Sequence, residues 1–153
     1  MRLPASIEFG DDDLDALIEV NALRAAGRSQ RLEQLEEHVA ARFHAQCRLA
    51  VYGSLAPGRS NHHQLRNLRG EWHSGCIVRG ELADRGWGAA LGYPALRWSN
   101  SGPAVPVELL VSDELPEHWL RLDEFEGPEY LRILVPVLSS TGVVAVANLY
   151  AAR

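Results

Sequence analysis

The stretch Val51-Tyr-Gly-Ser-Leu-Ala-Pro-Gly58 joins an apolar run to a loop that contains glycine, serine and proline. Residues 49–52 are compact and apolar, which is typical of a buried strand. Backbone N–H groups in a loop that follows such a strand can turn inward and bind an anion. Gly53 lets a ligand approach the backbone closely because it has no side chain, and Ser54 adds a hydroxyl donor. An ordinary strand-to-loop turn explains the same residues, so this stretch alone leaves both interpretations open.

Short apolar runs separated by glycine and proline follow this stretch. We expect strands at residues 76–82, 105–111, 130–138 and 143–150, with the residues 139–142 as a hairpin turn. The run at 130–138 alternates, so that one face carries Leu131, Ile133, Val135 and Val137. A series of short strands of this kind predicts a barrel-like or strongly curved sheet.

Residues 1–46 have a helical pattern instead. Asp11, Asp12 and Asp13 suit the first turn of a helix, Gly27 suits its end, and Ser29 suits the N-cap of a second helix. The expected apolar stripes are Leu14, Leu17, Ile18 and Leu23 in the first helix, and Leu32, Leu35, Val39 and Phe43 in the second. These stripes can pack on the domain that follows, or they can form the interface of a homodimer.

A further helix is predicted within Asp113–Gly127, from Pro116 to Phe125, with Asp113 as its cap. Successive helical residues are about 100° apart. Measured from Trp119, Glu126 therefore lies at about 340°, on the apolar face, whereas Glu124 at about 140° points away and Asp123 at about 40° lies on the border. An inward carboxylate has a raised pKa, which suits proton transfer. An end-of-helix glutamate that reaches solvent or pairs with an arginine is the alternative.

Length, composition and charge limit the classes of protein to which this chain can belong. The 153 residues fit one domain of ordinary size, and 46% of them are hydrophobic, enough for a folded core. Lys and Arg number 15 against 20 Asp and Glu, and the resulting charge of −5 argues against a general nucleic-acid binder. No apolar run approaches the roughly 20 residues that cross a bilayer, and the start has no signal-peptide pattern. Cys47 and Cys76 form no CxxC pair, so we expect reduced thiols, no structural zinc and a cytoplasmic protein.

Two segments together resemble the γ-glutamylcyclotransferase-like family, which includes the plant avirulence-induced proteins. They are Tyr52-Gly-Ser-Leu55, and Leu122-Asp-Glu-Phe-Glu-Gly127 followed by Tyr130-Leu-Arg132. Further matches are Asn61-His62, Gly75, Gly80 and Tyr150. The resemblance covers roughly residues 48–150, and the helical segment before it departs from the family's usual form. We therefore divide the chain into an N-terminal helical extension, 1–46, and a γ-glutamylcyclotransferase-like domain, 47–153.

The resemblance implies an α+β fold in which a small mixed β-barrel packs against helices. It also implies an enzyme that releases an amine from a γ-glutamyl amide and leaves 5-oxoproline. Carried over by motif, Tyr52, Gly53, Ser54 and Leu55 form the substrate-binding loop, and Glu126 is the catalytic acid/base. The substrate's own α-amine attacks the γ-carbonyl, so we expect no cofactor. The expected partner is a small γ-glutamyl substrate. A non-catalytic protein that binds a γ-glutamyl or other carboxylate ligand on the same fold is the alternative.

Other residues carry weaker signals. The resemblance implies a ligand cavity between the substrate-binding loop and Glu126, and Tyr130 and Tyr150 can reach this cavity or pack beside it. Arg132 can pair with a substrate carboxylate or with an acidic side chain such as Asp123. His62, His63, His73 and Cys76 lack the spacing of a metal site. We expect surface or hydrogen-bonding roles for His62 and His63, and structural roles for His73 and Cys76. Residues 84–94 are rich in glycine and aromatics and form either a specificity loop, with Trp87, Tyr93 and Trp98 shaping the leaving-amine pocket, or a plain long loop.

Overall fold

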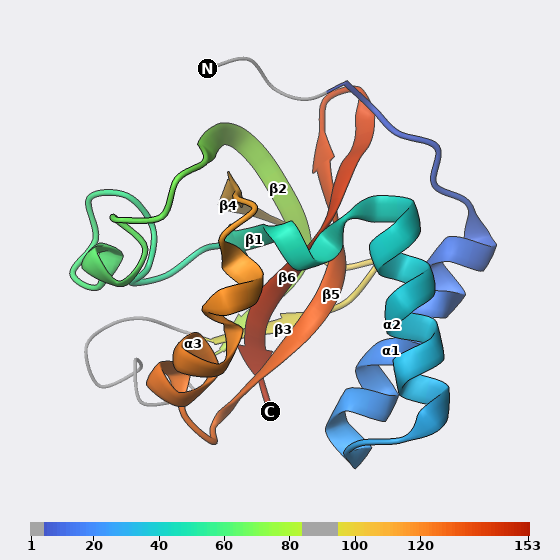
Figure 1. The fold of residues 1–153 in the computed structure, drawn as a ribbon. Coiled ribbons are helices and arrows are strands. Elements are labelled where there is room, and N and C mark those ends of the chain that lie inside the picture. Colours follow the sequence, from blue (N-terminus) through green and yellow to red (C-terminus); the bar gives the residue numbers. More distant parts are fainter. Residues whose placement is uncertain (1–4, 84–94) are drawn as a thin grey trace.

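The computed structural model describes residues 5–83 and 95–153. Two helices, α1 (Asp11–Ala26) and α2 (Gln30–Phe43), precede the strands, and α3 (Trp119–Glu126) lies between the fourth and fifth of these (Figure 1). The strands are β1 (Arg48–Val51), β2 (Glu71–Ala83), β3 (Ala95–Trp98), β4 (Ala104–Val111), β5 (Tyr130–Ser139) and β6 (Gly142–Ala152). Within the described residues, no helix has both the length and the apolar character that a membrane span requires.

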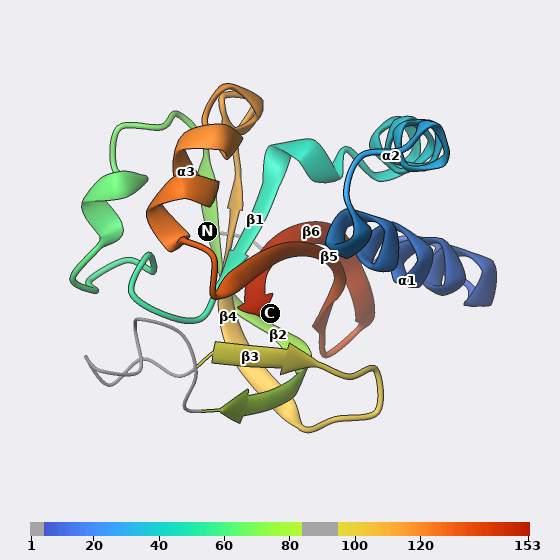
Figure 2. The ribbon, with the colours of Figure 1, turned by 90° about the horizontal axis from the view of Figure 1, so that it is seen from below.

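The strands form a closed, mixed barrel. They hydrogen-bond in the order β1-β4-β2-β3-β6-β5, and additional pairings of β1 with β6 and of β2 with β5 close the sheet. β6 runs parallel to β1 and β3, whereas the other pairs are antiparallel. Seen from below, the strands curl around a common centre and the helices lie outside (Figure 2). The predicted α+β fold with a small mixed barrel and packed helices is confirmed.

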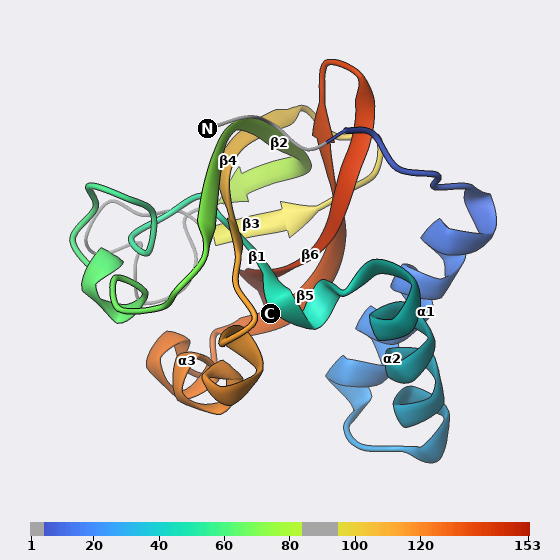
Figure 3. The same ribbon diagram turned by 45° about the horizontal axis from the view of Figure 1, so that its top comes forward.

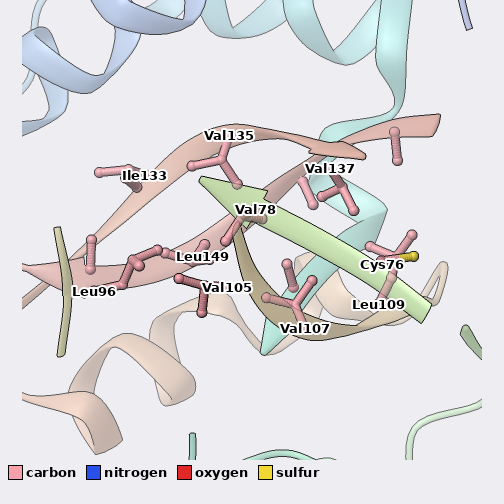
Figure 4. Close-up of a cluster of buried hydrophobic side chains, with 14 of the residues drawn as sticks. Cys76, Val78, Leu96, Val105, Val107, Leu109, Ile133, Val135, Val137 and Leu149 are labelled. Atoms are coloured by element: carbon pink, nitrogen blue, oxygen red, sulfur yellow. The ribbon is translucent and has the colours of Figure 1, made fainter. Parts of the chain in front are cut away.

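The barrel interior is filled by aliphatic side chains from its strands (Figure 4). On β5, Ile133, Val135 and Val137 are buried in this core, and Leu131 packs against it, as the alternation predicts. The intervening Leu134 is buried as well, because it belongs to a second cluster on the outer side of β5. Both faces of β5 are therefore covered.

The N-terminal helices provide the outer cover of β5 and β6. Leu17 and Val20 of α1, and Val39 and Phe43 of α2, share one buried cluster with Leu134 and Val146 of the barrel. Figure 3 shows the helical pair beside these strands. The predicted start of α1 at Asp11, its end at Gly27 and the cap at Ser29, whose Oγ accepts a hydrogen bond from Leu32 N–H (3.1 Å), are confirmed.

The predicted inner face of α1 is partly wrong. Ile18 is 48% exposed, whereas the buried face continues from Leu17 and Val20 to two polar residues, Asn21 and Arg24. The Asn21 side chain donates to Leu134 O (2.9 Å) and accepts from Leu134 N–H (2.8 Å). It thereby satisfies backbone groups on the side of β5 that faces the helix, where a neighbouring strand would otherwise bind.

The structure also differs from the sequence-based expectation before α3. A 3₁₀ turn, Leu115–Glu117, contains Pro116, and α3 begins only at Trp119. Asp113 is not the cap of this helix. Instead, the hydroxyl of the buried Ser112 accepts a hydrogen bond from Glu114 N–H (3.2 Å). β3 was not predicted, because a strand of four residues carries too short a pattern to be detected.

Candidate functional site

Glu126 lies in the last turn of α3 and is 8% exposed. It shares the buried face with Trp119 and Leu122, whereas Glu124 is exposed and Asp123 is half-buried, so the predicted orientation of all three carboxylates is confirmed. Gly127, with φ of 85°, ends the helix, and this left-handed conformation favours glycine. Burial raises the pKa of Glu126 to about 7, and the nearby charge of Asp123 adds to this effect.

The loop after β1 packs against the same helix. Leu55 and Ala56 are buried in one apolar cluster with Trp119 and Leu122. Ala56 N–H donates to Gly53 O (3.1 Å), and this bond closes the turn. The side chain of Leu55 therefore belongs to the core, and this residue can meet a ligand only through its backbone.

The backbone N–H groups at the start of this loop are available. Among the described residues, none accepts a hydrogen bond from the amides of Gly53, Ser54 or Leu55. Apart from Gly53 and its two neighbours in the chain, no described residue has an atom within 4 Å of the position that a Cβ on Gly53 would occupy. The space beside the Cα atom of Gly53 is thus open to a ligand, as an anion-binding loop requires.

Tyr52 ties this loop to the barrel. Its hydroxyl donates to Tyr150 O (2.7 Å) and accepts a hydrogen bond from Leu96 N–H (2.8 Å), so it joins the end of β1 to β6 and β3. Burial raises the pKa of Tyr52, and the electrostatic influence of Tyr130 and Glu126 adds to the rise. Tyr130 and Glu126 are therefore close enough to influence Tyr52. The sequence analysis assigned all three residues to the candidate site.

Tyr130 and Tyr150 are both buried in the cluster that contains Leu55. The hydroxyl of Tyr150 donates to Asp123 Oδ1 (2.6 Å). Burial, followed by this hydrogen bond, raises the pKa of Tyr150. The Tyr150 side chain therefore contacts the acidic residue one helical turn before Glu126.

Arg132 pairs with Asp123, which is one of the two partners that the sequence left open. Its Nε lies 2.9 Å from Asp123 Oδ1, and its guanidinium stacks 4.5 Å from the centre of the Trp119 ring. A second guanidinium nitrogen donates to Asn148 Oδ1 (2.9 Å). A role of Arg132 toward a substrate carboxylate stays a prediction.

Two members of this network were missed by the sequence analysis. Asn148 is 1% exposed and accepts hydrogen bonds from both Arg132 and Arg24, each at 2.9 Å. Arg24 also donates to Arg132 O (3.0 Å) and forms an ion pair with Glu36 (2.5 Å). The spacing of Arg24, seven residues after Leu17, places it on the inner face of α1 and is the signal that could have identified it.

The remaining sequence candidates occupy structural positions. His62 hydrogen-bonds to Leu55 O (3.0 Å), and His73 is buried with its Nε2 3.5 Å from Glu71. In residues 5–83 and 95–153, no group of three or more His, Cys, Asp or Glu side chains is arranged to hold a metal ion. Trp98 ends β3 and packs against the barrel core. The predicted specificity loop at 84–94, with Trp87 and Tyr93, lies outside the described residues.

The comparisons with known proteins place this barrel in a family. The family model described as gamma-glutamyl cyclotransferase, AIG2-like, matches residues 49–153. The chain therefore belongs to this family. None of the curated proteins with which the sequence was compared matches it.

Two solved structures are similar to the barrel. YkqA from Bacillus subtilis is 26% identical with a TM-score of 0.53, over 70% of this chain and 36% of YkqA. An AIG2-like protein from Mus musculus is 23% identical with a TM-score of 0.54, over 70% of this chain and 77% of that protein. The chain thus matches only about a third of the length of YkqA, and the similarity to the mouse protein concerns the fold.

Proposed function

We propose that this protein is a γ-glutamylcyclotransferase that converts a γ-glutamyl amide into 5-oxoproline and a free amine. The α-amine of the substrate attacks its own γ-carbonyl carbon, and a new C–N bond closes the five-membered ring. The bond from that carbon to the amide nitrogen breaks, and the leaving nitrogen takes up a proton. The step needs no enzyme nucleophile, metal or cofactor, because the attacking group and the leaving group belong to the same substrate.

The observation that carries this proposal is the burial of Glu126 on the face of α3 whose Trp119 and Leu122 pack against Leu55 of the loop after β1. A carboxyl group with a pKa of about 7 is present in both protonation states at neutral pH. Glu126 therefore accepts a proton from the attacking amine and returns it to the leaving nitrogen. A positioned acid/base of this kind typically contributes 10²–10⁴-fold in rate.

The loop and the tyrosines around Glu126 hold the substrate in a bent conformation. The N–H groups of Gly53, Ser54 and Leu55 bind the α-carboxylate or the developing oxyanion, and Tyr52, Tyr130 and Arg132 complete the walls of the site. Alignment of the amine with the carbonyl removes the entropy cost of the ring closure, and such alignment is worth up to roughly 7–11 kcal/mol.

Detection of 5-oxoproline by mass spectrometry tests the proposal. The purified protein is incubated with γ-glutamyl amines, γ-glutamyl dipeptides and γ-glutamyl-ε-lysine isopeptides. We expect Glu126→Gln to lose at least about 100-fold in kcat. Glu117→Gln is the matched control, because Glu117 is exposed in the turn before α3, and it should retain wild-type turnover.

Two results would contradict the proposal. Turnover that survives in Glu126→Gln would remove the assigned acid/base. Binding of γ-glutamyl compounds without 5-oxoproline from any of them would indicate a non-catalytic binding protein on the same fold.

A further inference from the structure

A cavity lies where the N-terminal helices meet the barrel; residues 53–55 do not line it, whereas Tyr130 and Arg132 of the candidate site do. It is a groove of about 660 Å³, within the size range of small-molecule sites. Its walls come from the turn between α1 and α2, the end of α3, the start of β5 and the end of β6. In Figure 1 the α1–α2 turn and the end of α3 lie on opposite sides of the first part of β5. Because α1 and α2 precede residue 49, one wall of this groove lies outside the family match.

The floor of the groove is a fixed polar network. Arg24 and Arg132 both donate to Asn148 Oδ1, and each also pairs with one carboxylate, Glu36 and Asp123 respectively. The side chains of Arg24 and Arg132 are only 12% and 20% exposed. Their carboxylate partners, Glu36 and Asp123, are 38% and 41% exposed, so each pair joins a largely buried guanidinium to a carboxylate at the surface.

The rim carries two more guanidinium groups. Arg28 lies in the α1–α2 turn and is exposed, and no ion pair joins it to any residue in the described part of the chain. Arg153 lies on the opposite wall, where its Nε donates to Pro128 O (2.9 Å), and no described residue accepts a hydrogen bond from its two terminal nitrogens. Both arginines therefore have N–H groups to offer to an occupant.

The charge of the lining limits the kind of occupant. Four arginines line the groove together with three acidic side chains, Glu36, Asp123 and Glu124, so the side chains carry one positive charge in excess. That excess matches a monoanion, and the planar N–H groups of arginine match a carboxylate. Leu32 and Pro128 add apolar surface on the two walls.

We propose that this groove is a binding site for a small monocarboxylate with an apolar body, held between Arg28 and Arg153. The carboxylate accepts hydrogen bonds from these two guanidinium groups, and the apolar part lies against Leu32 and Pro128. The site goes beyond the proposed cyclotransferase activity: it shares Tyr130 and Arg132 with the candidate site, but it binds its ligand without chemical change and uses neither Glu126 nor the loop after β1.

Titration of the ¹⁵N-labelled protein with 3-phenylpropionate tests this site. We expect chemical-shift changes at the amides of residues 27–32 and 129–132, and a Kd that rises about tenfold in Arg28→Gln and in Arg153→Gln, equivalent to about 1.4 kcal/mol each. Arg66→Gln is the matched control, because Arg66 is exposed, loses the same charge and does not line the groove. The neutral amide, 3-phenylpropionamide, should bind at least tenfold more weakly than the acid.

Each other outcome overturns the proposal. Shift changes confined to residues 53–55 would place the ligand at the loop after β1, and equal affinity in all three arginine variants would exclude Arg28 and Arg153 as its partners. Inorganic phosphate that binds as tightly as the monocarboxylate would contradict the inferred ligand class. The same titration of Glu126→Gln, compared with 5-oxoproline formation by the wild type, separates this site from the proposed activity, because binding here does not depend on turnover.

Discussion

Replacement of Glu126 by glutamine should make the free energy of unfolding less sensitive to pH. Burial raises the pKa of this side chain from 4.5 to about 7 in the folded protein. Between these two pH values the folded state binds more protons than the unfolded state, so stability falls as the pH rises, and the loss is complete above pH 7. At about 1.4 kcal/mol per pKa unit, the wild type loses about 3 kcal/mol over this window. Glutamine has nearly the same shape and does not titrate.

Urea unfolding between pH 4 and pH 8.5 measures this effect. The difference in unfolding free energy, Glu126→Gln minus wild type, should rise by about 3 kcal/mol from pH 4.5 to pH 8. Glu117→Gln, on the exposed side of the preceding turn, should show no such rise. A difference for Glu126→Gln that stays constant with pH would mean that the carboxylate is charged in the folded protein. The argument for a proton-transfer group at neutral pH would then fail.

Three other substitutions test the contacts around the site, each by denaturant unfolding at pH 7. Asn148→Leu removes the buried acceptor shared by two guanidinium groups and should cost about 2–4 kcal/mol; a cost under 0.5 kcal/mol would show that the network does not stabilise the fold. Tyr52→Phe leaves the N–H of Leu96 without its acceptor and should cost about 1–3 kcal/mol, whereas an unchanged midpoint would contradict this bond. Gly80→Ala places a Cβ 2.5 Å from Arg97 O and should cost about 1–3 kcal/mol; wild-type stability would refute the close packing of β2 on β3.

Periodicity was sufficient to predict the elements with long apolar patterns and the orientation of the carboxylates on α3. Glu126 could be placed on the inner face because Trp119 and Leu122 define that face within two turns of one helix. The strand β3 and the turn before α3 could not be predicted, because both depend on neighbours distant in sequence. β3, for example, pairs with β2 and β6, and its short run of residues resembles a loop.

The polar contacts within the site were the least predictable part. Asp123 and Arg132 lie nine residues apart, and the sequence could name their pairing only as one of two alternatives. Their connection to Asn148 depends on the β5–β6 register, which pairs Leu134 with Asn148 and Arg132 with Tyr150. No local pattern encodes such a register when both faces of a strand are buried.

The position of α1 explains why residues outside the family match belong to the same folded unit. The Asn21 side chain hydrogen-bonds to both backbone groups of Leu134, and Arg24 donates hydrogen bonds to Asn148 Oδ1 and Arg132 O. If these groups stayed buried without this helix, each one left without a hydrogen-bond partner would cost about 1–3 kcal/mol. Leu134, now fully covered, would also lose its apolar contacts with the helices. The helices therefore stabilise the barrel through the same strand, β5, that carries Tyr130 and Arg132 to the candidate site.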